Sequence, residues 1–212
     1  MAIYAIIPVK NLADSKMRLS TVFTPQEREK LTLAMLEDVL KALKSSVVDK
    51  IVIVAEDSQV QQAAKKFGAF YLFANGATLN SAVEETTSYC VKKGARSVLV
   101  LPADVPLINS KEIDRIIQLA KGHDSAVVLS PSRNWGTNAL YQSPPKLIPA
   151  CFGPESFLNH IREAYQKGIS VTLHLSPELA ADIDSVEDLK KLFKIQNTTC
   201  SKHFLEQMGF NQ

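Results

Sequence analysis

The stretch AIYAIIPVKNLADSKMRLS, residues 2–20, opens with an apolar run and indicates the class of fold. The run is continuous rather than alternating, which is typical of a strand buried on both faces of a sheet. A helical pattern follows over residues 24–45, where Thr24 is the expected N-cap and Glu27 completes a capping box. KIVIVAE, residues 50–56, is a second strand-like run. The chain therefore begins as a strand–helix–strand unit.

The same alternation continues along most of the chain. Further strands are expected within residues 69–74, 97–107, 124–132, 137–144 and 169–175, and further helices within residues 58–68, 79–94, 110–122, 155–168 and 184–194. Apolar strands separated by helices predict an α/β fold with a mostly parallel sheet covered on both faces. TNALYQSP, residues 137–144, is a candidate antiparallel partner. In such sheets ligands bind outside the carboxyl ends of the strands.

The bulk composition is that of an ordinary globular protein. The chain has 212 residues, 46% hydrophobic and 22% charged, and we expect one domain with a C-terminal appendage from about residue 195. A net charge of +2 is too small to predict nucleic acid or an anionic membrane surface as partner. No apolar run is long enough to span a membrane and no leader pattern opens the chain, so we expect a cytoplasmic protein. Its three cysteines form neither a disulfide framework nor a metal motif, and Cys90 is expected to be buried.

The loop after the first strand carries Lys10, Lys16 and Arg18. It contains no glycine-rich phosphate-binding motif, which argues against a P-loop protein or a standard dinucleotide-binding fold. Cations at the carboxyl edge of a parallel sheet suit a polyphosphate, which an Arg can bind bidentately and a Lys as a point charge. The alternative is a solvated loop. Its position after the first strand favours phosphate binding.

Three aspartates are candidates for a metal site. Asp104 follows the buried strand SVLV within LPADVPL, where it is either a turn residue or a ligand for a divalent cation. Asp182 and Asp184 are two residues apart, so in an extended segment both point the same way. Asp184 also fits a helix cap with Glu187, and the two roles are compatible.

Small residues and hydroxyls recur in WGTNALY and CFGPESF. Gly136 with Thr137, and Gly153 with Ser156, offer hydroxyls and accessible backbone N–H groups. Ser156 is expected at the start of a helix, where an anion is favoured, although a plain N-cap explains it equally. Trp135 is expected to be a packing residue.

Five sequence blocks together resemble the 2-phospho-L-lactate guanylyltransferases of coenzyme F-420 biosynthesis. In chain order the blocks are PVKNLADSKMRLS, LPADVPL, GTNAL, FGPESFLNH and DIDSVEDL. These guanylyltransferases are relatives of the molybdenum-cofactor nucleotidyltransferases, and the match covers about residues 3–194. The resemblance implies a nucleotide-diphosphate-sugar-transferase-like fold, a three-layer α/β/α sandwich whose mostly parallel sheet has an antiparallel component. It also implies transfer of GMP from GTP to 2-phospho-L-lactate, with Mg²⁺ as cofactor.

The resemblance assigns roles by position. The residues expected at the nucleotide are Pro8, Lys10, Lys16, Arg18 and Asn80, of which Lys10, Lys16 and Arg18 are the catalytic cations. Asp104, Asp182 and Asp184 would hold Mg²⁺. Thr137, Gly153 and Ser156 would bind the phospho-acid.

Several alternatives remain open from sequence. The first loop lacks the glycines of sugar nucleotidyltransferases, which argues against a sugar nucleotide or a molybdopterin as acceptor. Phosphoenolpyruvate is an alternative acceptor, and a non-catalytic nucleotide-binding module is a rival of another class. A homodimer is expected from the family likeness and from the apolar piece HFLEQMGF, residues 203–210.

Overall fold

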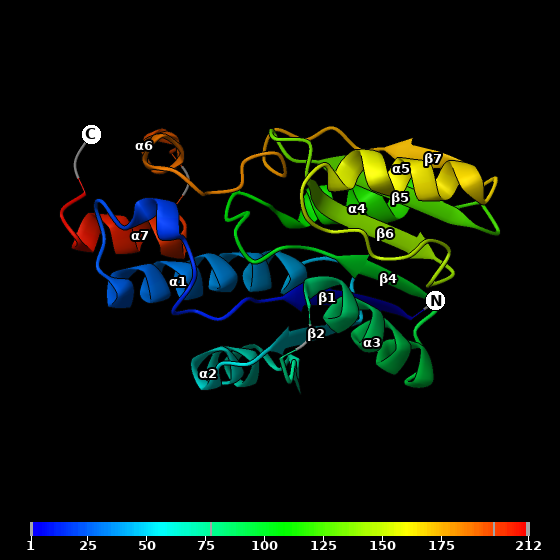
Figure 1. Ribbon diagram of the computed structural model, residues 1–212, viewed down its shortest axis with the longest axis horizontal. Helices are drawn as coiled ribbons and strands as arrows, with labels where there is room; N and C mark the ends of the chain where they lie inside the picture. Colours follow the sequence, from blue (N-terminus) through cyan, green and yellow to red (C-terminus); the bar gives the residue numbers. More distant parts are fainter. Residues whose placement is uncertain (1, 77, 197, 211–212) are drawn as a thin grey trace.

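A computed structural model describes residues 2–76, 78–196 and 198–210 (Figure 1). The strands are β1 Ile3–Pro8, β2 Lys50–Ala55, β3 Phe70–Phe73, β4 Ser97–Val100, β5 Ala126–Pro131, β6 Thr137–Ser143 and β7 Val171–Leu173. The helices are α1 Pro25–Lys44, α2 Ser58–Phe67, α3 Leu79–Lys92, α4 Ser110–Leu119, α5 Ser156–Gln166, α6 Val186–Lys194 and α7 Cys200–Gln207, with a short 3-10 helix η1, Met17–Leu19. Each lies within or close to the range predicted for it, except η1 and α7, for which no helix was predicted.

The strands form one mixed sheet in the order β3-β2-β1-β4-β6-β5-β7. β1 pairs in parallel with β2 and β4, while β6 runs antiparallel to both β4 and β5. The expected antiparallel component is thus confirmed in β6. Because β1 lies between β2 and β4, the loops that leave β1 and β4 emerge side by side at one edge of the sheet, where ligands bind in open α/β sheets.

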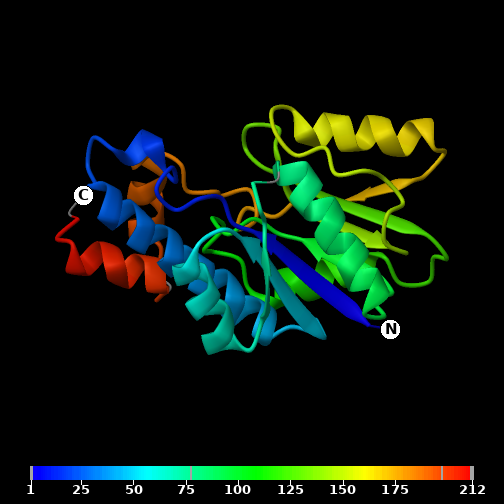
Figure 2. The ribbon, with the colours of Figure 1, turned by 60° about the horizontal axis from the view of Figure 1, so that its bottom comes forward.

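Helices cover both faces of the sheet, which makes three layers (Figures 1 and 2). One core cluster joins the sheet to α1, α2 and α4 and includes Ile7, Ile53 and Leu99. The other joins the opposite face to α3 and α5 and includes Tyr4 and Ile6. Neighbouring residues of β1 therefore enter opposite cores, as the two-residue period of a strand requires.

The helix ends confirm part of the sequence analysis and correct another part. Thr24 and Glu27 form the expected capping box of α1. The cap of α6 is Ser185, whose hydroxyl accepts from the backbone N–H of Asp188, and not the predicted Asp184. Serine is as good an N-cap as aspartate. The Asp184 carboxylate is consequently available for another partner.

The C-terminal appendage packs on its own chain. α7 lies along α1 (Figure 1), where the buried Asp38 carboxylate accepts from both backbone N–H and hydroxyl of Ser201. Leu205, fully buried, joins a third core cluster with Leu19 and Phe23. Three apolar side chains of HFLEQMGF, Phe204, Leu205 and Phe210, belong to or pack against this cluster within the chain, and packing of the segment on a partner stays a prediction. Dimer formation itself stays a prediction.

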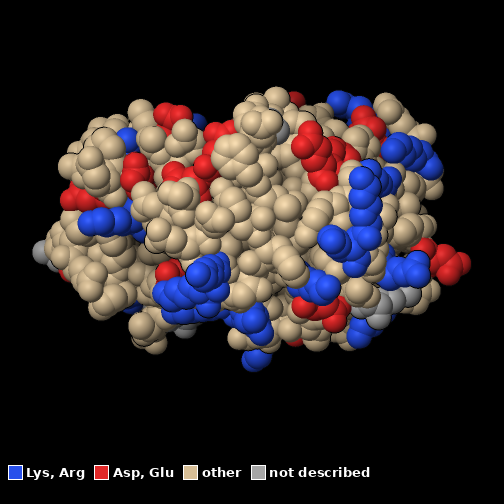
Figure 3. Space-filling model, turned by 90° about the horizontal axis from the view of Figure 1, so that it is seen from below, with Lys and Arg blue, Asp and Glu red and all other residues tan. Residues whose placement is uncertain are grey.

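Two surface observations bear on partners. No helix among the described residues is long and apolar enough to cross a membrane. On the face drawn in Figure 3, Lys and Arg side chains gather in separate groups divided by uncharged surface. That face does not present the continuous basic stripe typical of nucleic-acid-binding proteins.

Candidate functional site

Lys16 joins the β1 loop to two carboxylates. Its ammonium Nζ lies 2.7 Å from Asp104 Oδ2 and 2.7 Å from Asp184 Oδ1, and its side chain is only 6% exposed. Burial alone would lower the pKa of Lys16, but the two carboxylates outweigh it and hold the pKa above its ordinary value. The ammonium therefore stays charged.

A backbone contact brings the two aspartates together across about eighty residues of chain. The N–H of Ile183 donates to the carbonyl of Asp104 at 3.0 Å. Ile183 is itself buried in the third core cluster, which fixes the segment in place. Because Ile183 is anchored there, Asp182 and Asp184, which flank it, are held next to the loop that follows β4.

Asp182 occupies a different environment from Asp184. Asn138 donates to it at 3.3 Å and also to the carbonyl of Leu179 at 2.7 Å. Burial raises the pKa of Asp182, and the negative charges of Asp104 and Asp184 raise it further, while the Asn138 hydrogen bond opposes the shift. The three predicted carboxylates are thus close enough to repel one another.

The carboxylates of Asp104 and Asp184 offer the donors that the predicted Mg²⁺ site requires. Asp104 and Asp184 already share one cation, the Lys16 ammonium, and two carboxylates are what Mg²⁺ usually takes from a protein. Among residues 2–76, 78–196 and 198–210, no three His, Cys, Asp or Glu side chains are grouped closely enough to hold a metal ion. The carboxylate pair of Asp104 and Asp184 fits Mg²⁺ chemically, and the roles of Asp104, Asp182 and Asp184 as its ligands stay predictions.

Three other members of the predicted nucleotide site belong to β1 and the segment that follows it. Pro8 is the last residue of β1, and Lys10 and Arg18 are exposed. Within the described parts of the chain, neither cation forms an ion pair. Both therefore have free charge to offer an anion, as the sequence analysis expected, but their contact with phosphate stays a prediction.

The predicted acid-binding residues come together where β6 begins and α5 begins. Thr137 Oγ1 lies 2.9 Å from His160 Nδ1, and the Ser156 N–H donates to the carbonyl of Gly153 at 3.2 Å. A Cβ on Gly136 would lie 3.9 Å from Ser156 Oγ, so the hairpin before Thr137 touches the start of α5. Ser156 is the first residue of α5 and not its N-cap, which is Glu155.

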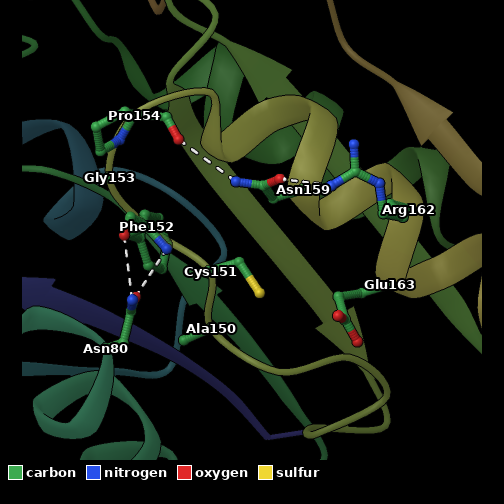
Figure 4. A pocket seen from close by; sticks show the side chains of 9 residues that line it. All are labelled: Asn80, Ala150, Cys151, Phe152, Gly153, Pro154, Asn159, Arg162 and Glu163. Atoms are coloured by element: carbon green, nitrogen blue, oxygen red, sulfur yellow. Dashed lines mark hydrogen bonds between the residues drawn. The ribbon is translucent and has the colours of Figure 1, made fainter.

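Asn80 supports this site instead of facing open solvent. Its amide donates to the carbonyl of Phe152 at 3.1 Å and accepts from the N–H of Phe152 at 2.7 Å (Figure 4). Asn80 and Gly153 also line a pocket of about 430 Å³, together with Cys151, Arg162 and others. The cation loop and the aspartates do not line it. A contact of Asn80 with guanosine stays a prediction.

Neighbouring residues of β6 connect the two halves of the site. Thr137 faces His160 on α5, whereas Asn138 faces Asp182 on the other side of the sheet. This follows from the alternation of side chains along a strand. Sequence reasoning passed over Asn138 and His160, although both lie in the quoted motifs GTNAL and FGPESFLNH. Trp135, expected to be a packing residue, is 60% exposed, though its ring lies 6.3 Å from that of Phe157.

Comparisons with known proteins agree with this geometry. The family model described as "Guanylyl transferase CofC like" matches residues 3–212. A phosphoenolpyruvate guanylyltransferase of Rubrobacter xylanophilus is 38% identical over 91% of this chain and 94% of its own. A 2-phospho-L-lactate guanylyltransferase of Methanobrevibacter ruminantium is 36% identical over 98% of this chain and 92% of its own.

Solved structures with similar folds include several nucleotidyltransferases. A protein of Desulfovibrio desulfuricans G20, described as a nucleotide-diphospho-sugar transferase, matches with a TM-score of 0.81 at 14% identity, over 99% of this chain and 96% of its own. The 4-diphosphocytidyl-2C-methyl-D-erythritol synthase of Anaerococcus prevotii matches with a TM-score of 0.65 at 12% identity, over 97% of this chain and 96% of its own. The likeness confirms the predicted nucleotide-diphosphate-sugar-transferase-like fold.

Proposed function

The chain belongs to the family of CofC-like guanylyltransferases, and we propose that it transfers the GMP group of GTP to the phosphate of 2-phospho-L-lactate, in the biosynthesis of coenzyme F-420. The observation that carries the proposal is the cation–carboxylate cluster at the carboxyl edge of β1 and β4. There Lys16 is buried between Asp104 and Asp184, with Lys10 and Arg18 exposed beside it in the sequence. This edge can hold a triphosphate and a divalent cation together.

Phosphoenolpyruvate is the second candidate acceptor. Relatives named for either acid align over nearly the whole of this chain, and the phosphoenolpyruvate guanylyltransferase of Rubrobacter is among them. Both acids carry a phosphate and a carboxylate on neighbouring positions of a three-carbon skeleton. Thr137, Gly153 and Ser156 offer donors suited to those shared anionic groups, so the choice between the acids depends on the remaining carbon.

The proposed reaction joins two anions. An oxygen of the acid's phosphate forms a bond to the α-phosphorus of GTP, while the bond between that phosphorus and the bridging oxygen breaks. Pyrophosphate leaves with the bonding electrons. The attacking oxygen is already an anion, so no strong general base is required, and catalysis consists of positioning and charge stabilisation.

The chain's own residues supply the positive charge and the orientation. Lys10 and Arg18, free of ion pairs among the described residues, are placed to bind phosphate oxygens. Asp104 and Asp184 are the residues that would hold Mg²⁺, which when bound neutralises charge on the triphosphate. Lys16 bridges the same two carboxylates, and with Mg²⁺ bound to them its ammonium would be available to the phosphates.

The acceptor is tested by steady-state kinetics of pyrophosphate release. Each of GTP, ATP and CTP is paired with 2-phospho-L-lactate, phosphoenolpyruvate and 3-phosphoglycerate in excess Mg²⁺. The proposal predicts the highest kcat/KM for GTP with 2-phospho-L-lactate. A higher kcat/KM with phosphoenolpyruvate would make the second candidate the function, and binding of GTP without pyrophosphate release with any acid would support a non-catalytic module.

A further inference from the structure

His160 is a fully buried histidine that sequence reasoning left without a role. It lies on α5, and both of its ring nitrogens have partners. Nε2 lies 2.9 Å from the backbone N of Cys151, and Nδ1 lies 2.9 Å from Thr137 Oγ1. The ring therefore spans the gap between the loop before α5 and the first residue of β6.

The identity of these partners fixes the tautomer of the ring. A backbone N–H can only donate, so Nε2 of His160 must accept from Cys151 and carry no proton. In a neutral imidazole the proton is then on Nδ1, which donates to Thr137 Oγ1. Burial lowers the pKa of His160 to about 4, with a hydrogen bond to the Ser156 backbone opposing the shift, so the ring is neutral near pH 7.

The tautomer in turn decides what Thr137 can do. A hydroxyl has one proton to donate and lone pairs to accept with. Because Nδ1 of His160 carries a proton and cannot accept, the proton of Thr137 cannot point at the ring. It is left to donate elsewhere, which suits a phosphate or carboxylate oxygen.

The same histidine helps to hold a loop in one conformation. Three successive N–H groups of that loop donate to side chains: Ala150 to Glu84 at 2.6 Å, Cys151 to His160 at 2.9 Å and Phe152 to Asn80 at 2.7 Å. Figure 4 shows the loop with Asn80 aimed at Phe152. The next residue, Gly153, has a φ of +130°, which glycine adopts freely. Among the described residues no acceptor takes its N–H.

We infer that His160 is the positioning residue of the acid site: it turns the hydroxyl proton of Thr137 toward the anionic acid and holds the loop that presents the Gly153 N–H. The inference rests on the proposed function for the identity of the acid. Its geometry does not, since the tautomer follows from contacts within the chain. The ligand class it selects is a small acid with acceptor oxygens on both its phosphate and its carboxylate.

The tautomer is tested directly by nitrogen NMR of histidine-labelled wild-type protein near pH 7. The proton of His160 is expected on Nδ1, the less common form in free imidazoles. A proton on Nε2 would overturn the inference whatever the enzyme does. If the proton is on Nδ1 but no acid yields pyrophosphate, the proposed function fails and the geometric inference stands.

Kinetics test the consequence for binding. His160→Gln keeps an acceptor near Cys151 but removes the donor to Thr137, whereas His160→Asn keeps a donor near Thr137. We expect His160→Gln to raise the KM for the acid roughly tenfold, the worth of one hydrogen bond, with the KM for GTP unchanged. His160→Asn should raise the acid KM less. His174→Gln, which removes a contact to Glu112 elsewhere, is the matched control and should leave the acid KM unchanged.

A double-mutant cycle separates positioning from a general structural effect. Thr137→Val should raise the acid KM, Thr137→Ser should restore it, and His160→Gln should add nothing in the Thr137→Val background. Equal rises in the KM for GTP and for the acid, or an additive effect in that background, would contradict the inference. The NMR measurement decides the matter even if a variant fails to fold.

Discussion

In the proposed metal site the Lys16 ammonium would compete with a divalent cation for the Asp104 and Asp184 carboxylates, so replacing Lys16 should strengthen metal binding. Lys16→Met keeps a long apolar stem and removes the charge. In the wild-type chain a cation that binds Asp104 and Asp184 must break two ion pairs of 2.7 Å. In the variant it meets two carboxylates with no cation between them.

The size of the effect follows from the exposure of the partners. The Asp104 and Asp184 side chains are 29% and 42% exposed. Each ion pair is therefore treated as solvent-exposed, with a stabilising free energy of roughly 0.2–1 kcal/mol. Two pairs then cost an incoming cation about 0.4–2 kcal/mol. Removing that cost should tighten binding of the cation by roughly 2- to 30-fold.

The assay is titration of the nucleotide-free protein with Mn²⁺, followed by the electron paramagnetic resonance signal of the free ion. Lys10→Met is the matched control, because it makes the same change of charge at an exposed side chain that pairs with neither aspartate in the described residues. We expect tighter binding in Lys16→Met, an affinity close to wild type in Lys10→Met, and no binding when Asp104→Asn is added to Lys16→Met. Equal affinities in Lys16→Met and Lys10→Met would refute the competition.

Three further predictions concern the metal, the appendage and the buried histidine. Asp104→Asn should lower kcat by about 100- to 1000-fold with an unchanged circular dichroism spectrum, because one carboxylate for the cation is lost; turnover like wild type in saturating Mg²⁺ would remove Asp104 from the metal site. Leu205→Ala leaves a cavity at a fully buried position and should lower the free energy of unfolding by about 2–5 kcal/mol. Leu158→Ala, at a side chain that is 44% exposed, should change it by less than about 0.5 kcal/mol. Equal effects of the two substitutions in urea titrations would contradict the packing of α7. The pKa of His160 falls from an ordinary 6.5 to about 4 on folding, so the unfolded chain binds its proton more readily and the free energy of unfolding falls as pH drops through that window. Between pH 7 and pH 5, wild type should lose about 2 kcal/mol more of this free energy than His160→Gln. Equal losses would refute a neutral buried ring.

Much of the fold could be predicted from sequence because it depends on local periodicity. The continuous apolar strands, the capping box at Thr24 and the glycine after α2 all specify their elements without help from distant residues. TNALYQSP was expected as a candidate antiparallel strand, and β6 is antiparallel to both β4 and β5. The cap of α6 was misassigned because Asp184 and Ser185 are both good caps, and only the pairing of Asp184 with Lys16 decides between them.

The parts that escaped prediction depend on contacts between distant segments. Lys16 was expected to face phosphate, and nothing in its loop indicates that Asp104 and Asp184 surround it in the ligand-free chain. Leu205 packs in one cluster with Leu19, Phe23 and Leu31, which belong to the start of the chain. His160 looked like one more helix residue, because its two partners come from β6 and from a loop.

We propose that this chain catalyses the attack of a phospho-acid on the α-phosphorus of GTP. The proposed attack is tested most directly by incubating the protein with Mg²⁺, 2-phospho-L-lactate and GTP labelled at its α-phosphorus, and following the label. The account predicts that the label enters a diphosphate that joins guanosine to lactate, in step with the release of unlabelled pyrophosphate. Label that stays in GTP or appears only in GDP, while the acid is present in excess, would contradict it.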